Sequence, residues 1–104
     1  MEIANSARLD KAAQRHPQTK TWLETWRRTV EAAAWTNLLD VRKTYPSADG
    51  VPIRAGALKL VVTVFNVGGN DYRPLTVINY RAQRVTVIDV LTHAEYDKEQ
   101  WKNQ

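Results

Sequence analysis

The chain contains no cysteine, only two histidines and a single methionine among its 104 residues. The lack of cysteine excludes disulfides and thiol chemistry, and it suits a cytoplasmic protein without requiring that location. His16 and His93 lie far apart and the carboxylates are scattered, so no group has the spacing of metal ligands. We therefore expect neither a metal nor another cofactor.

Long hydrophobic runs are also missing. No apolar stretch reaches the roughly 18 residues that a membrane-spanning helix needs. The first residues, MEIANSARLD, lack the apolar core of a signal peptide. Glycine and proline are few, at four each, so low-complexity or linker segments are not indicated. We predict a single domain over residues 1–104, in the cytoplasm and without membrane contact.

What the chain has in excess is positive charge, +4 in total, and this charge is unevenly distributed. Residues 42–84 carry seven basic and two acidic side chains, whereas the segments before and after them have net charges of +1 and −2. A basic segment of this size favours contact with phosphate, although it also serves solubility alone.

The N-terminal half has helical periodicity after a short first strand at residues 2–4. Ser6 is the expected N-cap of a helix that runs to Arg15. A third helix is expected from Asn37, as its cap, to about residue 44, and residues 45–57 are predicted to form a surface loop because they hold two prolines and two glycines. A second helix is predicted over residues 19–34, with a buried apolar stripe of Trp22, Trp26, Val30 and Ala33.

The second half changes to the periodicity of β-strands. We predict strands at residues 60–65, 72–80 and 84–91, separated by turns at 68–71 and 81–83. Pro74 predicts an edge or a bulge within the second of these strands. The expected fold class is α+β: an antiparallel sheet of three strands, or four with residues 2–4, packs against N-terminal helices and is followed by a short C-terminal helix.

The segment LTHAEYDKEQW, residues 91–101, fits the junction of a strand with this last helix. Thr92 and Glu95 have the spacing of a capping box, so the helix is expected to start at Thr92. His93 and Tyr96 then lie on one face of its first turn, and Tyr96 and Trp101 are expected to pack the helix against the sheet. Helix capping alone explains this pattern, and catalysis is favoured only by features outside it.

Three segments, taken in order, resemble one known family: WRRTVEAAAWTNLLDVRKTYPSAD, VFNVGGNDYRPLTVINYR and VTVIDVLTHAEYDKEQW. Over residues 26–101 they are similar to the HigB family of type II toxin–antitoxin systems, within the RelE-like mRNA interferases. FNVGGNDYR and LTHAEYDK are much more specific together than either is alone. The resemblance implies a RelE-like fold and a ribosome-dependent endoribonuclease that cuts mRNA during translation and arrests growth. It also implies a HigA-like antitoxin with a helix-turn-helix domain, and repression of operator DNA by the toxin–antitoxin complex.

The residues of the matched segments suit metal-free RNA cleavage, in which the neighbouring 2′-OH attacks the phosphate. A histidine titrates near neutral pH, a tyrosine donates a proton, and an arginine binds two phosphate oxygens at once. Our hypothesis makes His93 the general base or acid, Tyr96 an orienting or proton-donating group, and Arg73 a phosphate clamp. Asp97 is either an orienting partner for one of them or an ordinary solvated residue.

Further residues are candidates for contact with messenger or ribosomal RNA. For the four basic ones, an ordinary surface charge is the simpler interpretation. Asn70 belongs to the same matched segment as Asn66. A turn role explains Asn70 better, because asparagine tolerates positive φ. The candidates are Lys59, Asn66, Arg81, Arg84 and Lys98.

One position departs from the family pattern. Members often carry an arginine four residues before the Thr-His pair, where this chain has Ile88, followed by the negatively charged Asp89. Losing one such cation costs about 3 kcal/mol of transition-state stabilisation. Three functions therefore stay open: an active mRNA interferase, a catalytically weak or inactive protein of the same fold that binds the ribosome or acts as an antitoxin co-repressor, and a free-standing RNA- or DNA-binding domain, which has the least support.

Overall fold

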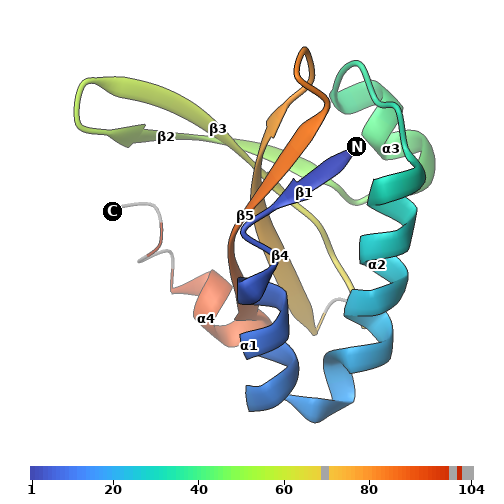
Figure 1. The fold of residues 1–104 in the computed structure, drawn as a ribbon. Coiled ribbons are helices and arrows are strands. Elements are labelled where there is room, and N and C mark those ends of the chain that lie inside the picture. Colours follow the sequence, from blue (N-terminus) through green and yellow to red (C-terminus); the bar gives the residue numbers. More distant parts are fainter. Residues whose placement is uncertain (69–70, 99–100, 102–104) are drawn as a thin grey trace.

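A twisted five-stranded sheet with helices on one face forms the body of the protein in a computed structural model that describes residues 1–68, 71–98 and 101 (Figure 1). The sheet order is β1-β5-β4-β3-β2. Strand β1 is parallel to β5, and the other neighbouring strands are antiparallel. The strands are β1 (Glu2–Ala4), β2 (Asp49–Ala55), β3 (Leu58–Val64), β4 (Tyr72–Asn79) and β5 (Arg84–Thr92).

The helices confirm the predicted α+β class. Three α-helices and one 3-10 turn precede the long strands, and one short helix follows them. None of the described helices is long and apolar enough to cross a membrane. The helices are α1 (Ala7–Arg15), η1 (Pro17–Thr19), α2 (Lys20–Ala32), α3 (Leu38–Thr44) and α4 (His93–Asp97).

The prediction of a loop over residues 45–57 is wrong for residues 49–55, because these residues form β2. Every residue from Asp49 to Ala55 is paired with β3 in an unbroken antiparallel register. This strand also raises the sheet from the expected three or four strands to five. Pro52 is tolerated there because β2 is an edge strand with a neighbour on one side only.

Two helix caps were predicted in the N-terminal half, at Ser6 and Asn37, and the structure forms one of them. The Asn37 side chain accepts a hydrogen bond from the backbone N–H of Asp40 at 3.0 Å, which satisfies one of the unpaired donors at the start of α3. Ser6 precedes α1 as expected, but its side chain makes no capping hydrogen bond. The start of α1 thus lacks the side-chain cap that the sequence suggested.

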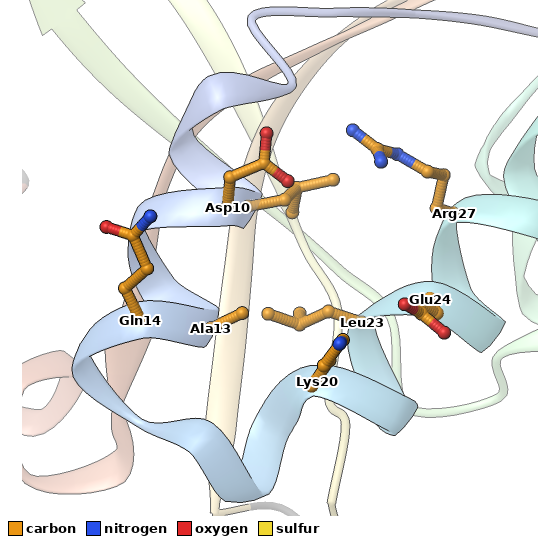
Figure 2. A pocket seen from close by; sticks show the side chains of 8 residues that line it. Asp10, Ala13, Gln14, Lys20, Leu23, Glu24 and Arg27 are labelled. Carbon is orange, nitrogen blue, oxygen red and sulfur yellow. The ribbon is translucent and has the colours of Figure 1, made fainter.

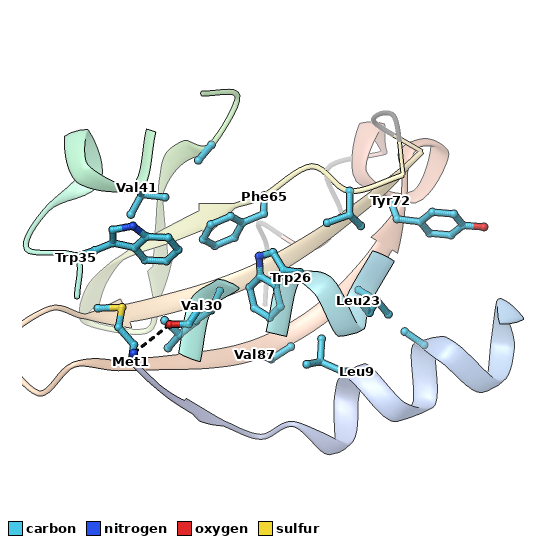
Figure 3. Close-up of a cluster of buried hydrophobic side chains, with 14 residues drawn as sticks. Met1, Leu9, Leu23, Trp26, Val30, Trp35, Val41, Phe65, Tyr72 and Val87 are labelled. Atoms are coloured by element: carbon cyan, nitrogen blue, oxygen red, sulfur yellow. Dashed lines mark hydrogen bonds between the residues drawn. The ribbon is translucent and has the colours of Figure 1, made fainter. Parts of the chain in front are cut away.

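The main core lies between the sheet and helices α1, α2 and α3 (Figure 3). Trp26 and Phe65 are almost completely buried, and their rings meet edge to face at 5.3 Å between centroids. The amino group of Met1 donates to the carbonyl oxygens of Val30 at 3.0 Å and Ala33 at 2.7 Å. Because the last carbonyls of a helix have no partner within the helix, these bonds stabilise the C-terminal end of α2.

Trp22 was predicted to belong to the buried stripe of α2, but its side chain is 37% exposed, and Leu23 is buried in its place. The indole covers Gly68, where an added Cβ would lie 2.5 Å from a ring carbon. Trp22 also lies against the Tyr72 ring, at 6.1 Å. Trp22 therefore anchors the segment between β3 and β4. Gly69 and Asn70 of this segment lie outside the described residues, and so does the predicted turn role of Asn70.

A smaller apolar cluster covers the opposite face of the sheet, and α4 is the helix that borders it. Along β5 the register shifts: Val87 pairs with Thr76 and Asp89 pairs with Leu75, so Ile88 is an extra, bulged residue. The prediction of an edge or a bulge at Pro74 is therefore wrong in its place: Pro74 pairs with Val90 in the central strand β4, and the bulged residue belongs to the neighbouring β5. This cluster contains Val62, Val64, Leu75 and Trp101, with Val51, Ile53, Ile88, Leu91 and Tyr96 packed around it.

Candidate functional site

The predicted capping box fixes helix α4 at the end of β5. The Thr92 hydroxyl accepts from the backbone N–H of Glu95 at 3.1 Å, and the Glu95 carboxylate accepts from the backbone N–H of Thr92 at 3.0 Å. The backbone N–H of His93 donates to the Asp71 carbonyl at 2.9 Å. This bond ties the first turn of α4 to the segment just before β4, and the direction of each α4 side chain follows from these contacts.

His93 and Asp97 form a pair on the solvent-facing side of α4. The Nδ1 atom of His93 lies 3.2 Å from Oδ2 of Asp97, and each side chain is more than half exposed. A neutral imidazole that donates its Nδ1 proton to the carboxylate keeps Nε2 as an acceptor. The geometry thus gives Asp97 a contact of the kind expected of an orienting partner.

Arg73 reaches Tyr96 from the neighbouring strand β4. Its guanidinium carbon lies 4.7 Å from the centroid of the Tyr96 ring, within the range of a cation–π contact. The Tyr96 ring also stacks on Trp101, at 5.2 Å between centroids and 22° between planes. Residues from two separate sequence motifs therefore meet where the central strands β4 and β5 border α4, a place that we call the candidate edge.

Asn66 holds Arg73 in this position. One terminal nitrogen of Arg73 donates to the Asn66 side-chain oxygen, and the Asn66 amide donates to the Ser47 carbonyl at 3.3 Å. The Nε atom of Arg73 is buried and has no hydrogen-bond partner among the described residues. Asn66, predicted to contact RNA, is thus engaged with a predicted catalytic residue and with the segment before β2.

The predicted RNA-contact residues do not gather at one place. Lys98 directly follows α4 and is exposed. Arg81 lies in the turn between β4 and β5, and Arg84 begins β5, so both lie at the opposite end of these strands from α4. Arg84 is also paired with Glu2 at 3.2 Å. Lys59 lies near the β2–β3 turn, four residues before the first β3–β4 pair.

Basic residues that sequence reasoning assigned no role lie beside α4 instead. Arg8, Lys11, Arg15 and His16 line a small depression of about 70 Å³ together with Asp89 and Val90 of β5. The available signal was their spacing along one helix. It was hidden because the segment that contains them has a net charge near zero.

A larger cavity does not contain the predicted chemistry. It is a groove of about 460 Å³ between α1 and α2, and none of the predicted site residues line it (Figure 2). Its floor includes Leu9 and Leu23, and both signs of charge surround it, including Asp10 and Arg27. Among the candidate catalytic side chains, His93 is 54% exposed outside this groove, and such exposure suits a polymeric substrate better than a small molecule.

The part of the chain that the structure describes contains no cluster of potential metal ligands. No three histidine or carboxylate side chains among those residues come together in a way that could hold an ion. The side chains that meet beside α4 supply imidazole, phenol, carboxylate and guanidinium groups.

Comparison with known proteins relates the chain to one family of toxins. A family model described as HigB toxin, a RelE-like toxic component of a toxin–antitoxin system, matches residues 19–99. The chain is 29% identical to the mRNA interferase toxin HigB of Escherichia coli strain K12 over 97 residues, which cover 93% of this chain and 88% of that protein. The mRNA interferase HigB of Shigella flexneri gives the same values. That of Escherichia coli O6:H1 strain CFT073 is 28% identical over 98 residues, covering 94% and 90% of the two chains.

The matched segment contains every residue that was predicted to take part in catalysis or RNA contact. It spans α2, α3, strands β2 to β5 and α4, which together hold the candidate edge. The chain thus belongs to the HigB family of RelE-like toxins, the toxic components of toxin–antitoxin systems.

Proposed function

We propose that this toxin is an mRNA interferase that cuts messenger RNA on the translating ribosome, in the cytoplasm, and thereby arrests growth. The observation that carries the proposal is the meeting of two motifs at one open edge: Arg73 contacts Tyr96, and His93 contacts Asp97 on the same short helix. Family membership and the printed names of the relatives support the same activity.

The proposed reaction needs no metal and uses the ribose beside the cleaved bond. A base removes the proton of the 2′-OH, and the oxygen attacks the adjacent phosphorus. The bond from phosphorus to the 5′-oxygen then breaks, and that oxygen takes up a proton. The products are a 2′,3′-cyclic phosphate and a free 5′-OH. His93 serves as the base or the acid, because Asp97 fixes one ring nitrogen and leaves the other for proton transfer.

Charge stabilisation in this reaction falls to Arg73. The pentacoordinate phosphate carries additional negative charge, which a guanidinium binds through two parallel N–H groups. Because Asn66 and the Tyr96 ring already hold the side chain, little conformational entropy is lost when phosphate arrives. Tyr96 thus orients Arg73 through its ring, and its hydroxyl is the second proposed proton donor. Asn66 has a positioning role.

A toxin of this family requires an antitoxin that neutralises it. We propose that the partner is HigA-like, with a helix-turn-helix domain, and that the complex represses its own operon at operator DNA. Co-expression of the neighbouring gene product, followed by gel filtration and an operator-binding assay, tests this pairing. Separate elution of the two proteins would reject it.

The activity is tested by mapping mRNA cleavage on programmed ribosomes by primer extension. Wild type should produce cuts at the decoding site with cyclic phosphate ends. His93→Ala and Arg73→Ala should each reduce the cleavage rate by at least about 100-fold. Arg28→Ala is the matched control, since Arg28 is exposed on α2 and away from α4. Full cleavage by His93→Ala at equal concentration would remove His93 from the mechanism.

A second function is favoured by one observation, the apolar Ile88 at the bulge of β5. It packs into the cluster that holds Tyr96 and Trp101, where the family often has a cation. If the folded wild-type chain binds ribosomes without cutting mRNA, the chain is a binding protein that retains the toxin fold. Retained binding without cleavage would therefore replace the first proposal with this one.

A further inference from the structure

Three basic residues recur on one face of α1. Arg8, Lys11 and Arg15 are spaced by three and four positions, so their side chains form a row along about 10 Å of the helix. All three are exposed, and they border the buried Leu9 and Ala12, which face the core. We call Arg8, Lys11, Arg15 and the following His16 the basic face of α1.

The basic face adjoins both elements that carry the candidate catalytic residues. It lines a depression with Asp89 and Val90, near the end of β5. The His16 ring lies 5.3 Å from the ring of Tyr72, which directly precedes Arg73. Figure 1 draws α1 directly beside α4, and the positive charges of Arg15 and His16 help to lower the pKa of Glu95, after its hydrogen bonds with Thr92.

The three cations of this face form no close ion pair within the described part of the chain. None of the ion pairs between described residues involves Arg8, Lys11 or Arg15. Two carboxylates lie nearby and keep their negative charge: Asp89 lines the same depression and accepts from the backbone N–H of Val90 at 2.8 Å, and Glu95 is part of the capping box. An external anion therefore meets three cations in a row that have no ion-pair partner among the described residues.

We propose that the basic face of α1 is a second RNA-contact surface, which binds backbone phosphates on the flank of the cleavage edge. The inference rests on the proposed action on RNA and extends it to a surface outside residues 19–99, the segment that the family model matches. Arginine and lysine in a row suit a polyphosphate chain because such contacts are independent of base sequence. The phosphates belong either to the message or to ribosomal RNA, which share this chemistry.

The surface also bears on the missing cation at position 88. Ile88 lies on the face of the sheet opposite helices α1 to α3, whereas the basic face belongs to α1, which packs on the other face. RNA held by α1 would cross α4, where His93 and Asp97 are exposed. Binding energy from phosphate contacts with α1 would hold the RNA strand beside α4 without a cation at position 88.

The experiment measures RNA affinity as a function of salt, in a His93→Ala background so that no RNA is cut. The test variant carries Arg8→Gln, Lys11→Gln and Arg15→Gln. The control carries Lys20→Gln, Arg28→Gln and Arg54→Gln, three exposed cations elsewhere, so that both variants lose the same charge. Each is titrated with a labelled 12-nucleotide single-stranded RNA and, separately, with ribosomes free of message, over a series of KCl concentrations.

The slope of log affinity against log salt should become less steep by about 2 in the test variant, because each lost single-strand phosphate contact removes about 0.7. The control should keep the slope of the background. A change with the oligonucleotide assigns the surface to the message, and a change with ribosomes alone assigns it to ribosomal RNA. Either supports the proposal.

Equal changes in the test and control variants would overturn it, because they would reflect net charge only. Loss of antitoxin binding with an unchanged RNA slope would also overturn it, and would assign the face to the protein partner. If the triple variant fails to fold, each single substitution should lower the slope by about 0.7. Cleavage of mRNA by the wild type is assayed in parallel. Absence of cleavage would reject the proposed enzyme, whereas the salt slopes would still show whether the basic face of α1 contacts RNA.

Discussion

The two faces of the sheet differ in how much apolar surface they bury. Among the described residues, the cluster under the helices contains fourteen buried side chains, including Trp26 and Phe65, whereas the cluster on the opposite face contains four. Stability is therefore concentrated on the helix side. The opposite face holds Tyr96, which packs against the smaller cluster and contacts Arg73.

The difference teaches that fold and candidate chemistry are largely separable in this chain. Substitutions under the helices should change the free energy of unfolding, whereas substitutions at the exposed edge should change activity with little effect on unfolding. The two regions are joined at a few contacts, and Trp22 over Gly68 is one of them. The predictions below test the separation, from the largest expected effect to the smallest.

Trp26→Ala should lower the free energy of unfolding by about 3–5 kcal/mol, because it leaves a cavity where the indole meets Phe65. His93→Ala, at a side chain 54% exposed, should change it by no more than about 0.5 kcal/mol. Urea denaturation followed by far-ultraviolet circular dichroism measures both. Similar losses in the two variants would show that the edge and the core are not separable.

Gly68→Ala should cost about 1–3 kcal/mol, since residue 68 has a φ of +61° and the added Cβ would press on Trp22. Gly56→Ala is a close control: its φ is +64°, but no atom lies within 4 Å of the added Cβ. The excess cost at position 68 measures the Trp22 contact. Because this segment leads to Arg73, mRNA cleavage should also fall in Gly68→Ala and persist in Gly56→Ala; equal behaviour would contradict the anchoring role of Trp22.

Ile88→Arg should raise the single-turnover rate of mRNA cleavage about tenfold, equivalent to about 1.4 kcal/mol. The arginine stem can pack along Leu75 and Trp101 while its guanidinium extends toward the edge. Ile88→Met, which preserves volume and apolarity, should leave the rate unchanged. An unchanged rate in folded Ile88→Arg would mean that the edge already has the positive charge that it needs.

Glu95→Gln should have the smallest effect at neutral pH, because glutamine also completes a capping box. The pKa of the Glu95 carboxyl is lowered in the folded state, first by its hydrogen bond from the Thr92 backbone. Its stabilising contribution is therefore present above its ordinary pKa of 4.5 and is lost as pH falls through the lower folded value. The stability difference between wild type and Glu95→Gln, measured from pH 7 to pH 3, should shrink on acidification; a constant difference would contradict this linkage.

Local signals allowed much of the secondary structure to be predicted. Asn37 and Thr92 cap their helices as their side chains suggest, because capping depends on residues within one turn. Strand β2 was missed because Gly50 and Pro52 are typical of loops. What overrides them is pairing with β3, a contact that no local pattern contains.

The candidate site divides in the same way. The sequence alone determined the residue types and motifs: the histidine and tyrosine on the first turn of α4, the arginine after the glycine turn, and the absence of cysteine. Only the tertiary structure decided that Asn66 holds Arg73, that Ile88 occupies a bulge, and that Arg8, Lys11 and Arg15 lie beside α4. The physical reason is that charge and hydrogen bonding act through space. A helix can direct its cations to one side while acidic residues elsewhere in residues 1–41 keep the net charge of that segment near zero.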